Sequence, residues 1–220
     1  MKLKRVFFDL DGTLTDSMPG ITKGVQYALK RYGIQVDDLS VLQPFVGPPL
    51  ADSFQEYYHF SEKDAEAAVY VFREYYDVEG WKDNAPFDGV EEMLSTLKKA
   101  GLRLYVATSK PEETAKRVLE YFHLTDYFEF IGGASLDEKR VNKDDVIRYV
   151  LRKNQIGEEE KDSVIMVGDR KHDVEGAHKM GLSVAGVLYG YGSREELTEA
   201  GADYLCETPE ETVGLLESMM

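Results

Sequence analysis

The stretch VFFDLDGTLTDS, residues 6–17, runs three apolar side chains directly into Asp9 and then into Asp11. An apolar run of this kind predicts a buried strand, and residues two apart in an extended chain point to the same side. Two carboxylates so placed repel each other, while Gly12 permits the turn that follows them. A lone pair of this kind could simply cap a turn, so the other strand ends must decide whether it marks a site.

The second half of the chain alternates between helical and strand patterns. Such alternation predicts right-handed crossovers and a parallel sheet with helices on both faces, an α/β fold of Rossmann-like type. We expect helices at 88–100, 111–122, 142–153, 172–180 and from Pro209 onward. We expect strands at 102–108, 128–133, 163–169, 182–190 and near 203–206.

Residues 18–78 carry no convincing strand pattern and predict an all-helical block. Apolar residues recur at helical spacing after Ile21 until Gly33, and further helices are expected at about 49–59 and 62–77, with Ser61 as an N-cap. The tract 78–90 is rich in turn residues. We therefore expect an α/β core of residues 1–15 and 85–220, with a helical domain inserted at 16–84.

Composition narrows the classes of partner. The 220 residues are 43% hydrophobic, and 41 acidic against 26 basic residues give a net charge of −15, which disfavours nucleic acid and anionic membranes. Cys206 is the single cysteine, so no intramolecular disulfide forms. The basic start is interrupted by Asp9 before it reaches signal-peptide length. We expect a soluble, cytoplasmic protein, a monomer or homodimer.

Polar residues at three strand ends indicate where the chemistry lies. Besides Asp9 and Asp11, one strand ends in Thr108-Ser109-Lys110 and another in Asp169, with Asp173 four residues on. Ligands of parallel sheets bind outside the carboxyl ends of the strands, and clustered carboxylates suit Mg²⁺. A cation held there calls for an anionic substrate such as phosphate. One carboxylate could then be a nucleophile and the other an acid/base.

Four segments resemble, in order, the four motifs of the haloacid dehalogenase-like hydrolase superfamily. They are FFDLDGTLTDS (7–17), VATSKP (106–111), RVNKDDVIRYVL (140–151) and MVGDRKHDVEGA (166–177). The helical block resembles the cap domain that this superfamily carries after its first motif. The resemblance thus covers nearly the whole chain and implies a phosphate-handling enzyme.

The resemblance also implies roles for individual residues. Asp9 would be the nucleophile and a metal ligand, and Asp11 the acid/base, which also lends its main-chain carbonyl to Mg²⁺. Asp169 would be a second metal ligand, with Asp173 as a further acidic anchor. The phosphoryl group would be bound by residues of the second and third motifs: Thr108, Ser109 and Lys143. Lys139 is a rival for the lysine role, but Lys143 stands where relatives carry theirs.

Within the superfamily, the chain looks most like the phosphoglycolate phosphatase and 5'-nucleotidase branch, partly from FVGPPLADSF at 45–54. Gly47 would line the entrance, although a plain loop between helices fits equally well. Lys23 and Arg31 are candidate lid contacts, although spacing alone favours solvated helix residues. His172 borders the fourth motif, and Arg170-Lys171 stands where relatives often show a small residue.

The implied activity is magnesium-dependent hydrolysis of a small phosphomonoester, phosphoglycolate or a nucleoside 5'-monophosphate, through an aspartyl-phosphate. The implied partner is therefore a small phosphorylated metabolite. Two other functions stay open: a phosphomutase acting on a sugar phosphate, and a phosphoreceiver signalling domain. The motif DGTL argues mildly against the mutase, and the length and the helical insertion argue against the receiver.

Overall fold

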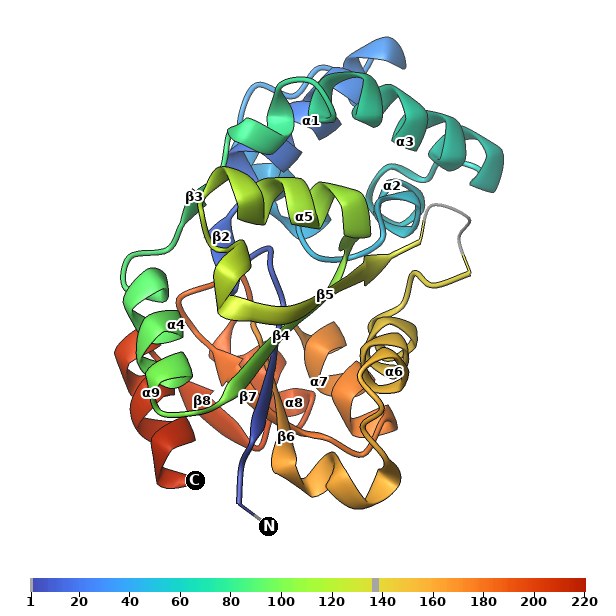
Figure 1. Ribbon diagram of the computed structural model, residues 1–220. Helices are drawn as coiled ribbons and strands as arrows, with labels where there is room; N and C mark the ends of the chain where they lie inside the picture. Colours follow the sequence, from blue (N-terminus) through green and yellow to red (C-terminus); the bar gives the residue numbers. More distant parts are fainter. Residues whose placement is uncertain (1, 136–138) are drawn as a thin grey trace. The chain divides into compact units, whose positions relative to one another are not determined.

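A computed structural model describes residues 2–135 and 139–220 of the chain. The described residues form a six-stranded sheet in the order β5-β4-β1-β6-β7-β8, and all its strand pairs are parallel (Figure 1). The strands are β1 Arg5–Phe8, β4 Arg103–Pro111, β5 Phe128–Ala134, β6 Val164–Gly168, β7 Ser183–Val187 and β8 Tyr204–Cys206. The predicted parallel α/β sheet is confirmed.

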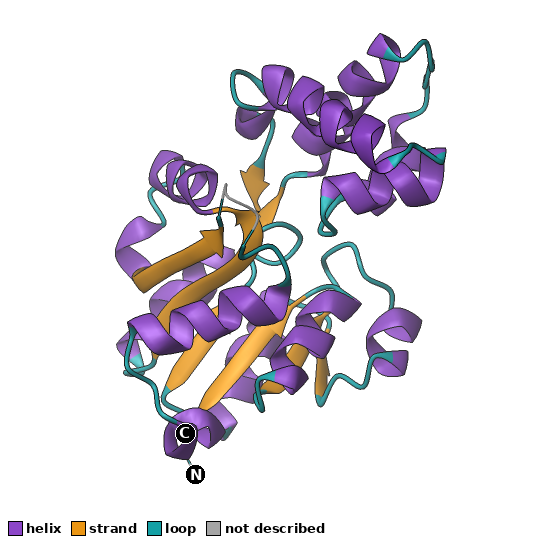
Figure 2. Cartoon of the chain, turned by 90° about the vertical axis from the view of Figure 1, so that its right-hand side faces the viewer, coloured by secondary structure: helices purple, strands orange, loops and turns teal. Residues whose placement is uncertain are grey.

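Helices cover both faces of the sheet (Figure 2). Crossovers running from β1 toward β5 carry α4 Val90–Lys99 and α5 Glu112–Tyr121, and α9 Pro209–Ser218 packs against α4. The crossovers that run back toward β8 carry α6 Lys143–Lys153, α7 Lys171–Lys179 and α8 Arg194–Glu199. Because crossovers are right-handed, the two directions place their helices on opposite faces. The strand order therefore reverses at β1, which is where open α/β sheets bind ligands.

A buried apolar core holds β1 in register with both neighbours. Phe7 lies opposite Tyr105 of β4 and Met166 of β6, and all three are fully buried. Val146 of α6 and Val174 of α7 belong to the same buried cluster. This packing fixes the level at which β1 ends, and with it the position of the acidic residues that follow.

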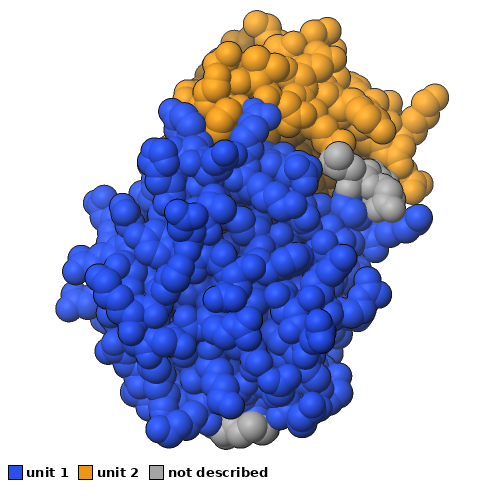
Figure 3. All heavy atoms as spheres, viewed as in Figure 1, with its two compact units in different colours: residues 1–15, 86–220 blue, residues 16–85 orange. Residues whose placement is uncertain are grey.

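The chain divides into two compact units, residues 1–15 with 86–220 and residues 16–85 (Figure 3). The division falls within a two-stranded sheet of β2 Thr15–Asp16 and β3 Ala85–Pro86. The described part of the second unit is helical. It contains α1 Met18–Arg31, η1 Leu39–Phe45, α2 Leu50–Tyr58, α3 Glu62–Tyr76 and η2 Gly80–Lys82.

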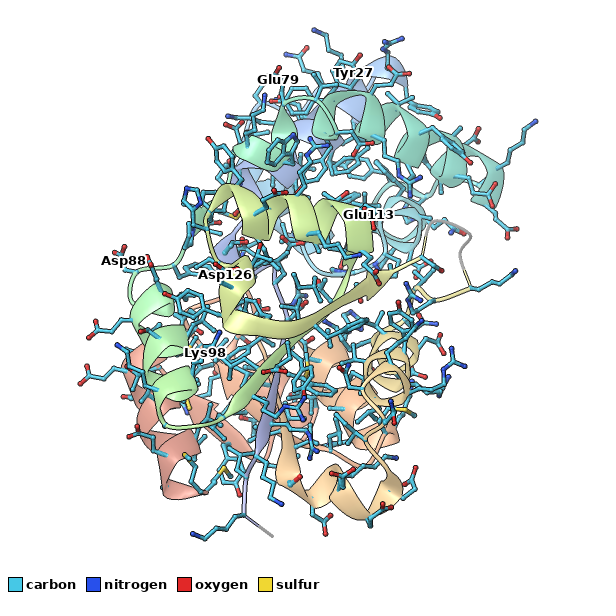
Figure 4. All side chains as sticks on the ribbon, in the orientation of Figure 1. Tyr27, Glu79, Asp88, Lys98, Glu113 and Asp126 are labelled. Carbon is cyan, nitrogen blue, oxygen red and sulfur yellow. The ribbon has the colours of Figure 1, made fainter. Side chains whose placement is uncertain are left out.

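Aromatic side chains build the interior of the helical unit. Phe54 and Phe72 are buried, and Tyr27, labelled in Figure 4, stacks on Tyr75 with ring centroids 5.8 Å apart. The expected N-cap is confirmed, since the Ser61 hydroxyl accepts a hydrogen bond from the Asp64 N–H at 3.1 Å. This unit thus has a core of its own.

Two expectations about the chain after the fourth motif were wrong. The strand predicted for 182–190 ends at Val187, and only the Leu188 N–H still pairs with β8, at 2.9 Å from the Cys206 carbonyl. Residues 189–193 form a loop, and Ser193 caps the short helix α8, which the sequence reading missed.

The strand predicted for 102–108 is longer and continues to Pro111. Among the described residues, no helix is both long and apolar enough to cross a membrane.

Candidate active site

The turn after β1 is built on Gly12. The Asp9 N–H continues the ladder to the Val167 carbonyl at 2.9 Å, and the Leu10 carbonyl then accepts from the Leu14 N–H at 2.9 Å. Gly12 has φ of +83°, and a Cβ there would lie 2.2 Å from Asp169 Oδ2. Only glycine meets both conditions, because other residues rarely adopt this backbone region and would clash with the carboxylate. The glycine therefore brings the end of β1 against the end of β6.

Three buried carboxylates converge at this point. Asp9 follows β1, Asp169 follows β6, and Asp173 lies in the first turn of α7, where its Oδ2 accepts from the Arg170 N–H at 3.0 Å. One carboxylate oxygen from each lies within 4.8 Å of the others, and their residues are 6%, 0% and 1% exposed. Charges this close and this deeply buried repel one another, and either a bound cation or bound protons would relieve the repulsion.

Burial and mutual repulsion act on the protonation of the cluster. Burial raises the pKa of Asp9, and Asp173 adds to the rise, while Lys143 and the Thr108 hydroxyl oppose it. Burial raises the pKa of Asp169 well above its usual range, with Asp173 and Asp9 contributing. Asp9 and Asp169 thus hold protons more readily than exposed carboxylates do, and a bound cation would favour their charged forms.

Lys143 supplies one positive charge to this cluster. It is the first residue of α6 and 5% exposed, and its Nζ lies 2.9 Å from Asp9 Oδ1 and 2.7 Å from Asp173 Oδ1. Nζ also donates to the Ala107 carbonyl at 3.2 Å. Burial disfavours the charged form, but the two carboxylates outweigh it and raise the pKa of Lys143. The rival Lys139 is exposed.

A second lysine, which the sequence reading did not assign to the site, pairs with Asp11. Lys110 Nζ lies 2.8 Å from Asp11 Oδ1 and 2.9 Å from Oδ2, and the lysine side chain is 3% exposed. The sequence did carry a signal for this lysine. Thr108 and Lys110 are two residues apart on β4, so their side chains project to the same side of the strand. The Asp11 carboxylate therefore has a partner of its own, separate from the three-carboxylate cluster. The expected contribution of its main-chain carbonyl to a metal stays a prediction.

The remaining predicted site residues fall in two places. Thr108 is 1% exposed and its hydroxyl bonds to Asp9 and accepts from the Lys110 N–H at 3.2 Å, while Ser109 beside it is half-buried. Gly47 belongs to the helical unit, in the turn between η1 and α2, with φ of +106°. Lys23 pairs with Asp83 at 2.7 Å inside that unit, so its charge is already compensated there.

The loop after β7 also reaches the cluster, which sequence reasoning missed because it read these residues as strand. The Tyr191 N–H donates to Asp169 Oδ2 at 2.8 Å. A Cβ on Gly190 would lie 2.1 Å from the Gly12 carbonyl oxygen, and one on Gly192 would lie 1.9 Å from the Asp169 carbonyl oxygen. Glycines on both sides of Tyr191 therefore allow the backbone itself to hold Asp169.

The donor set fits a magnesium ion. Mg²⁺ prefers oxygen ligands, and Asp9, Asp169 and Asp173 present carboxylate oxygens at one point. Lys143 offsets part of their charge, so the cluster keeps a net negative charge. These three residues are the ones that could hold the ion.

Comparisons with known proteins identify the family of the chain. The family model described as haloacid dehalogenase-like hydrolase matches residues 6–187. A 5'-nucleotidase from Pseudomonas aeruginosa is 41% identical over 206 residues, covering 94% of this chain and 92% of the relative. A phosphoglycolate phosphatase from Vibrio vulnificus is 30% identical, covering 94% and 93%.

A solved structure shows the same fold. It is described as a predicted phosphatase from Clostridium acetobutylicum, is 48% identical, and superposes with a TM-score of 0.96 over 99% of this chain and 100% of that one. The matches confirm the family and the enzyme class, a phosphoric monoester hydrolase, that the four motifs predict.

Proposed function

We propose that this chain, which belongs to the haloacid dehalogenase-like hydrolase family, hydrolyses a small phosphomonoester through a phosphoryl group carried on Asp9. One observation carries the proposal. The Asp9 carboxylate lies in a buried cluster with Asp169, Asp173 and Lys143, while Asp11, two residues on, pairs with Lys110 instead. Such an arrangement gives the two acids unequal surroundings and so unequal work.

In the first step the Asp9 carboxylate attacks phosphorus. Lys143 and the Leu10 N–H hold Asp9 Oδ1, at 2.9 and 2.8 Å, so we assign the attack to Oδ2. As the bond from Oδ2 to phosphorus forms, the bond from phosphorus to the leaving oxygen breaks. Asp11 gives its proton to that oxygen, and the alcohol departs with Asp11 as carboxylate.

In the second step water takes the place of the alcohol. Asp11 removes a proton from the water, the oxygen attacks phosphorus, and the bond to Asp9 breaks to release inorganic phosphate. Asp9 returns as carboxylate and Asp11 regains its proton, so the cycle closes without a net change in the enzyme.

The other residues bind and position. The Thr108 hydroxyl, which hydrogen-bonds to Asp9, would donate to a phosphoryl oxygen of the substrate instead. Lys143 would neutralise charge beside the nucleophile. Asp9, Asp169 and Asp173 would hold Mg²⁺, which when bound supplies positive charge to the phosphoryl oxygens. In this proposal the helical unit takes the part of the cap domain and selects the leaving group.

Among small phosphomonoesters we favour nucleoside 5'-monophosphates over phosphoglycolate. The support is relative similarity, since the relative named 5'-nucleotidase is 41% identical and the one named phosphoglycolate phosphatase is 30% identical. The motifs decide the chemistry rather than the leaving group, so the substrate must be measured.

The deciding experiment is a panel of phosphoesters assayed for kcat/KM with Mg²⁺. It compares nucleoside 5'-monophosphates, phosphoglycolate and sugar phosphates, with an aryl phosphate as a generic substrate. We expect release of inorganic phosphate that stops in excess EDTA, and the highest kcat/KM with a nucleotide. Hydrolysis that persists undiminished in EDTA would overturn the metal-dependent mechanism, and a preference for phosphoglycolate would overturn the substrate class alone.

A further inference from the structure

The residues after Asp169 depart from the small side chain that relatives often carry, and the structure shows where they go. Arg170 Nε donates to Glu196 Oε1 at 2.8 Å, and the Lys171 N–H donates to the same oxygen at 2.9 Å. Glu196 lies in the first turn of α8, and the two paired side chains are 14% and 23% exposed. Arg170 is thus committed to a contact within the fold rather than presented as a free cation.

The same short stretch of chain carries two of the three clustered carboxylates. The Arg170 N–H donates to Asp173 Oδ2 at 3.0 Å, and Asp169 directly precedes Arg170. From the other side, the Tyr191 N–H donates to Asp169 Oδ2 at 2.8 Å. The segment 169–173 is therefore held at the Asp169 side chain by the Tyr191 N–H, and at the Arg170 side chain and the Lys171 N–H by Glu196.

Charge gives Glu196 a second effect on the cluster. Arg170 directly follows Asp169 in the chain, so its guanidinium is tethered next to the cluster. The Glu196 carboxylate offsets the guanidinium charge in a partly buried setting, where uncompensated charges are costly. Without Glu196, the guanidinium would be attracted to the three carboxylates and would compete with a metal for them.

We propose that Glu196 is a positioning residue that holds the segment 169–173, which leads into α7, through Arg170 and Lys171 and thereby sets the affinity of the carboxylate cluster for Mg²⁺. The proposal rests on the proposed function, which places the metal at Asp9, Asp169 and Asp173. Glu196 itself touches neither substrate nor metal. Its role is to fix the geometry of the ligands and to keep the Arg170 charge away from them.

The test measures Mg²⁺ binding by calorimetry on the metal-free full chain, without substrate. Glu196→Ala removes the carboxylate, and Glu196→Gln keeps an acceptor but removes the charge. Glu195→Ala and Glu195→Gln are matched controls, because Glu195 is the exposed neighbour in the same turn of α8. We expect Kd for Mg²⁺ to rise about tenfold in Glu196→Ala, less in Glu196→Gln, and not in the controls.

A second readout separates positioning from general loss of structure. If Glu196 acts through the metal ligands, raising the Mg²⁺ concentration restores most of the kcat of Glu196→Ala, whereas a misfolded fraction would not recover. A Kd in both Glu196 variants equal to that of a clearly binding wild type would overturn this proposal alone. A wild type that binds no Mg²⁺ would overturn the metal assignment and this proposal with it.

Discussion

Asp9 and Asp11 stand two residues apart on one turn, yet they belong to different electrostatic regions. Asp9 shares Lys143 with Asp173 and lies among carboxylates that repel it. Asp11 pairs instead with Lys110, with both carboxylate oxygens within 2.9 Å of Nζ. The difference teaches that two acids close in sequence can have different surroundings, and the proposed mechanism gives them different roles. The lysine beside each acid comes from an element far away in sequence: Lys143 of α6 for Asp9 and Lys110 of β4 for Asp11.

The sharpest way to break the comparison is to remove the Asp9 carboxylate. Asp9→Asn keeps the shape of the side chain but not the nucleophile, so turnover should fall by at least about 10⁴-fold with every phosphoester. Stopped-flow assays with an aryl phosphate should show no burst of phenol. Turnover near the wild-type rate would contradict a phosphoryl group on Asp9.

Asp11→Asn should fail in a different way. An aryl oxygen leaves readily without a proton, so the first step should proceed once, while the water in the second step lacks its base. We expect a phenol burst of about one per active site followed by a steady rate lowered about 10²–10⁴-fold. A steady state as fast as that of the wild type, or the complete absence of a burst, would show that the two acids are not divided as proposed.

Much of the fold is legible in the sequence because the patterns that decide it are local. Apolar runs and helical periodicity mark the strands and helices on either side of Asp9 and Asp169, and the parallel sheet follows from their alternation. The same logic places their side chains at one edge of the sheet. Lys143 could be named because a motif, rather than periodicity, singled it out from Lys139.

The features that escaped prediction depend on contacts between distant segments. The pairing of Lys110 with Asp11 requires the register between β1 and β4, which neither strand specifies alone. Tyr189 favours strands by propensity and Leu188 is apolar, so the local pattern predicts strand. The loop that forms there instead brings the Tyr191 N–H to Asp169, a contact between distant segments. Arg170 stands where relatives often show a small residue, and only its contact with Glu196 of α8 explains the larger side chain.

Removing the second lysine should have a smaller effect than removing either acid. In Lys110→Met the Asp11 carboxylate loses the partner that orients it, and a displacement of about 1 Å lowers kcat by about 10²-fold at most. KM should change little if Lys110 acts on Asp11 alone. Lys116→Met on α5 is the control, since that lysine side chain is 44% exposed. An unchanged kcat in Lys110→Met would remove Lys110 from the proposed division of labour.

The smallest expected effect is on stability, and it depends on pH. Because folding raises the pKa values of Asp9 and Asp169, the folded chain binds more protons than the unfolded chain between the two sets of values. Their contribution to the free energy of unfolding therefore falls as pH rises through that window. Mg²⁺ should offset this loss and raise Tm by about 5 °C at pH 7.5.

At pH 5 protons compete more strongly for Asp9 and Asp169 than at pH 7.5, because folding raises the pKa of both carboxyls, so the rise in Tm with Mg²⁺ should be smaller. Thermal unfolding followed by circular dichroism, with Mg²⁺ or with EDTA at each pH, measures both values. In Asp11→Asn the rise in Tm with Mg²⁺ should still be smaller at pH 5 than at pH 7.5, because Asp11 pairs with Lys110 outside the cluster. A larger rise in Tm at pH 5 than at pH 7.5 would reverse the sign and contradict the assignment of the metal to this cluster.

The small ribbon of β2 and β3 has a consequence for engineering and for evolution. The helical unit leaves the catalytic chain after Thr15 and returns to it at Pro86, and these two crossings lie on paired strands. Paired strands lie about 4.8 Å apart, so both joints of the insertion fall within one hydrogen-bonded pair. A foreign module whose ends lie at that separation could be grafted there in one cut. The core unit would then keep the residues of the candidate active site, while evolution or a designer replaces the helical unit, which in the proposed function selects the leaving group.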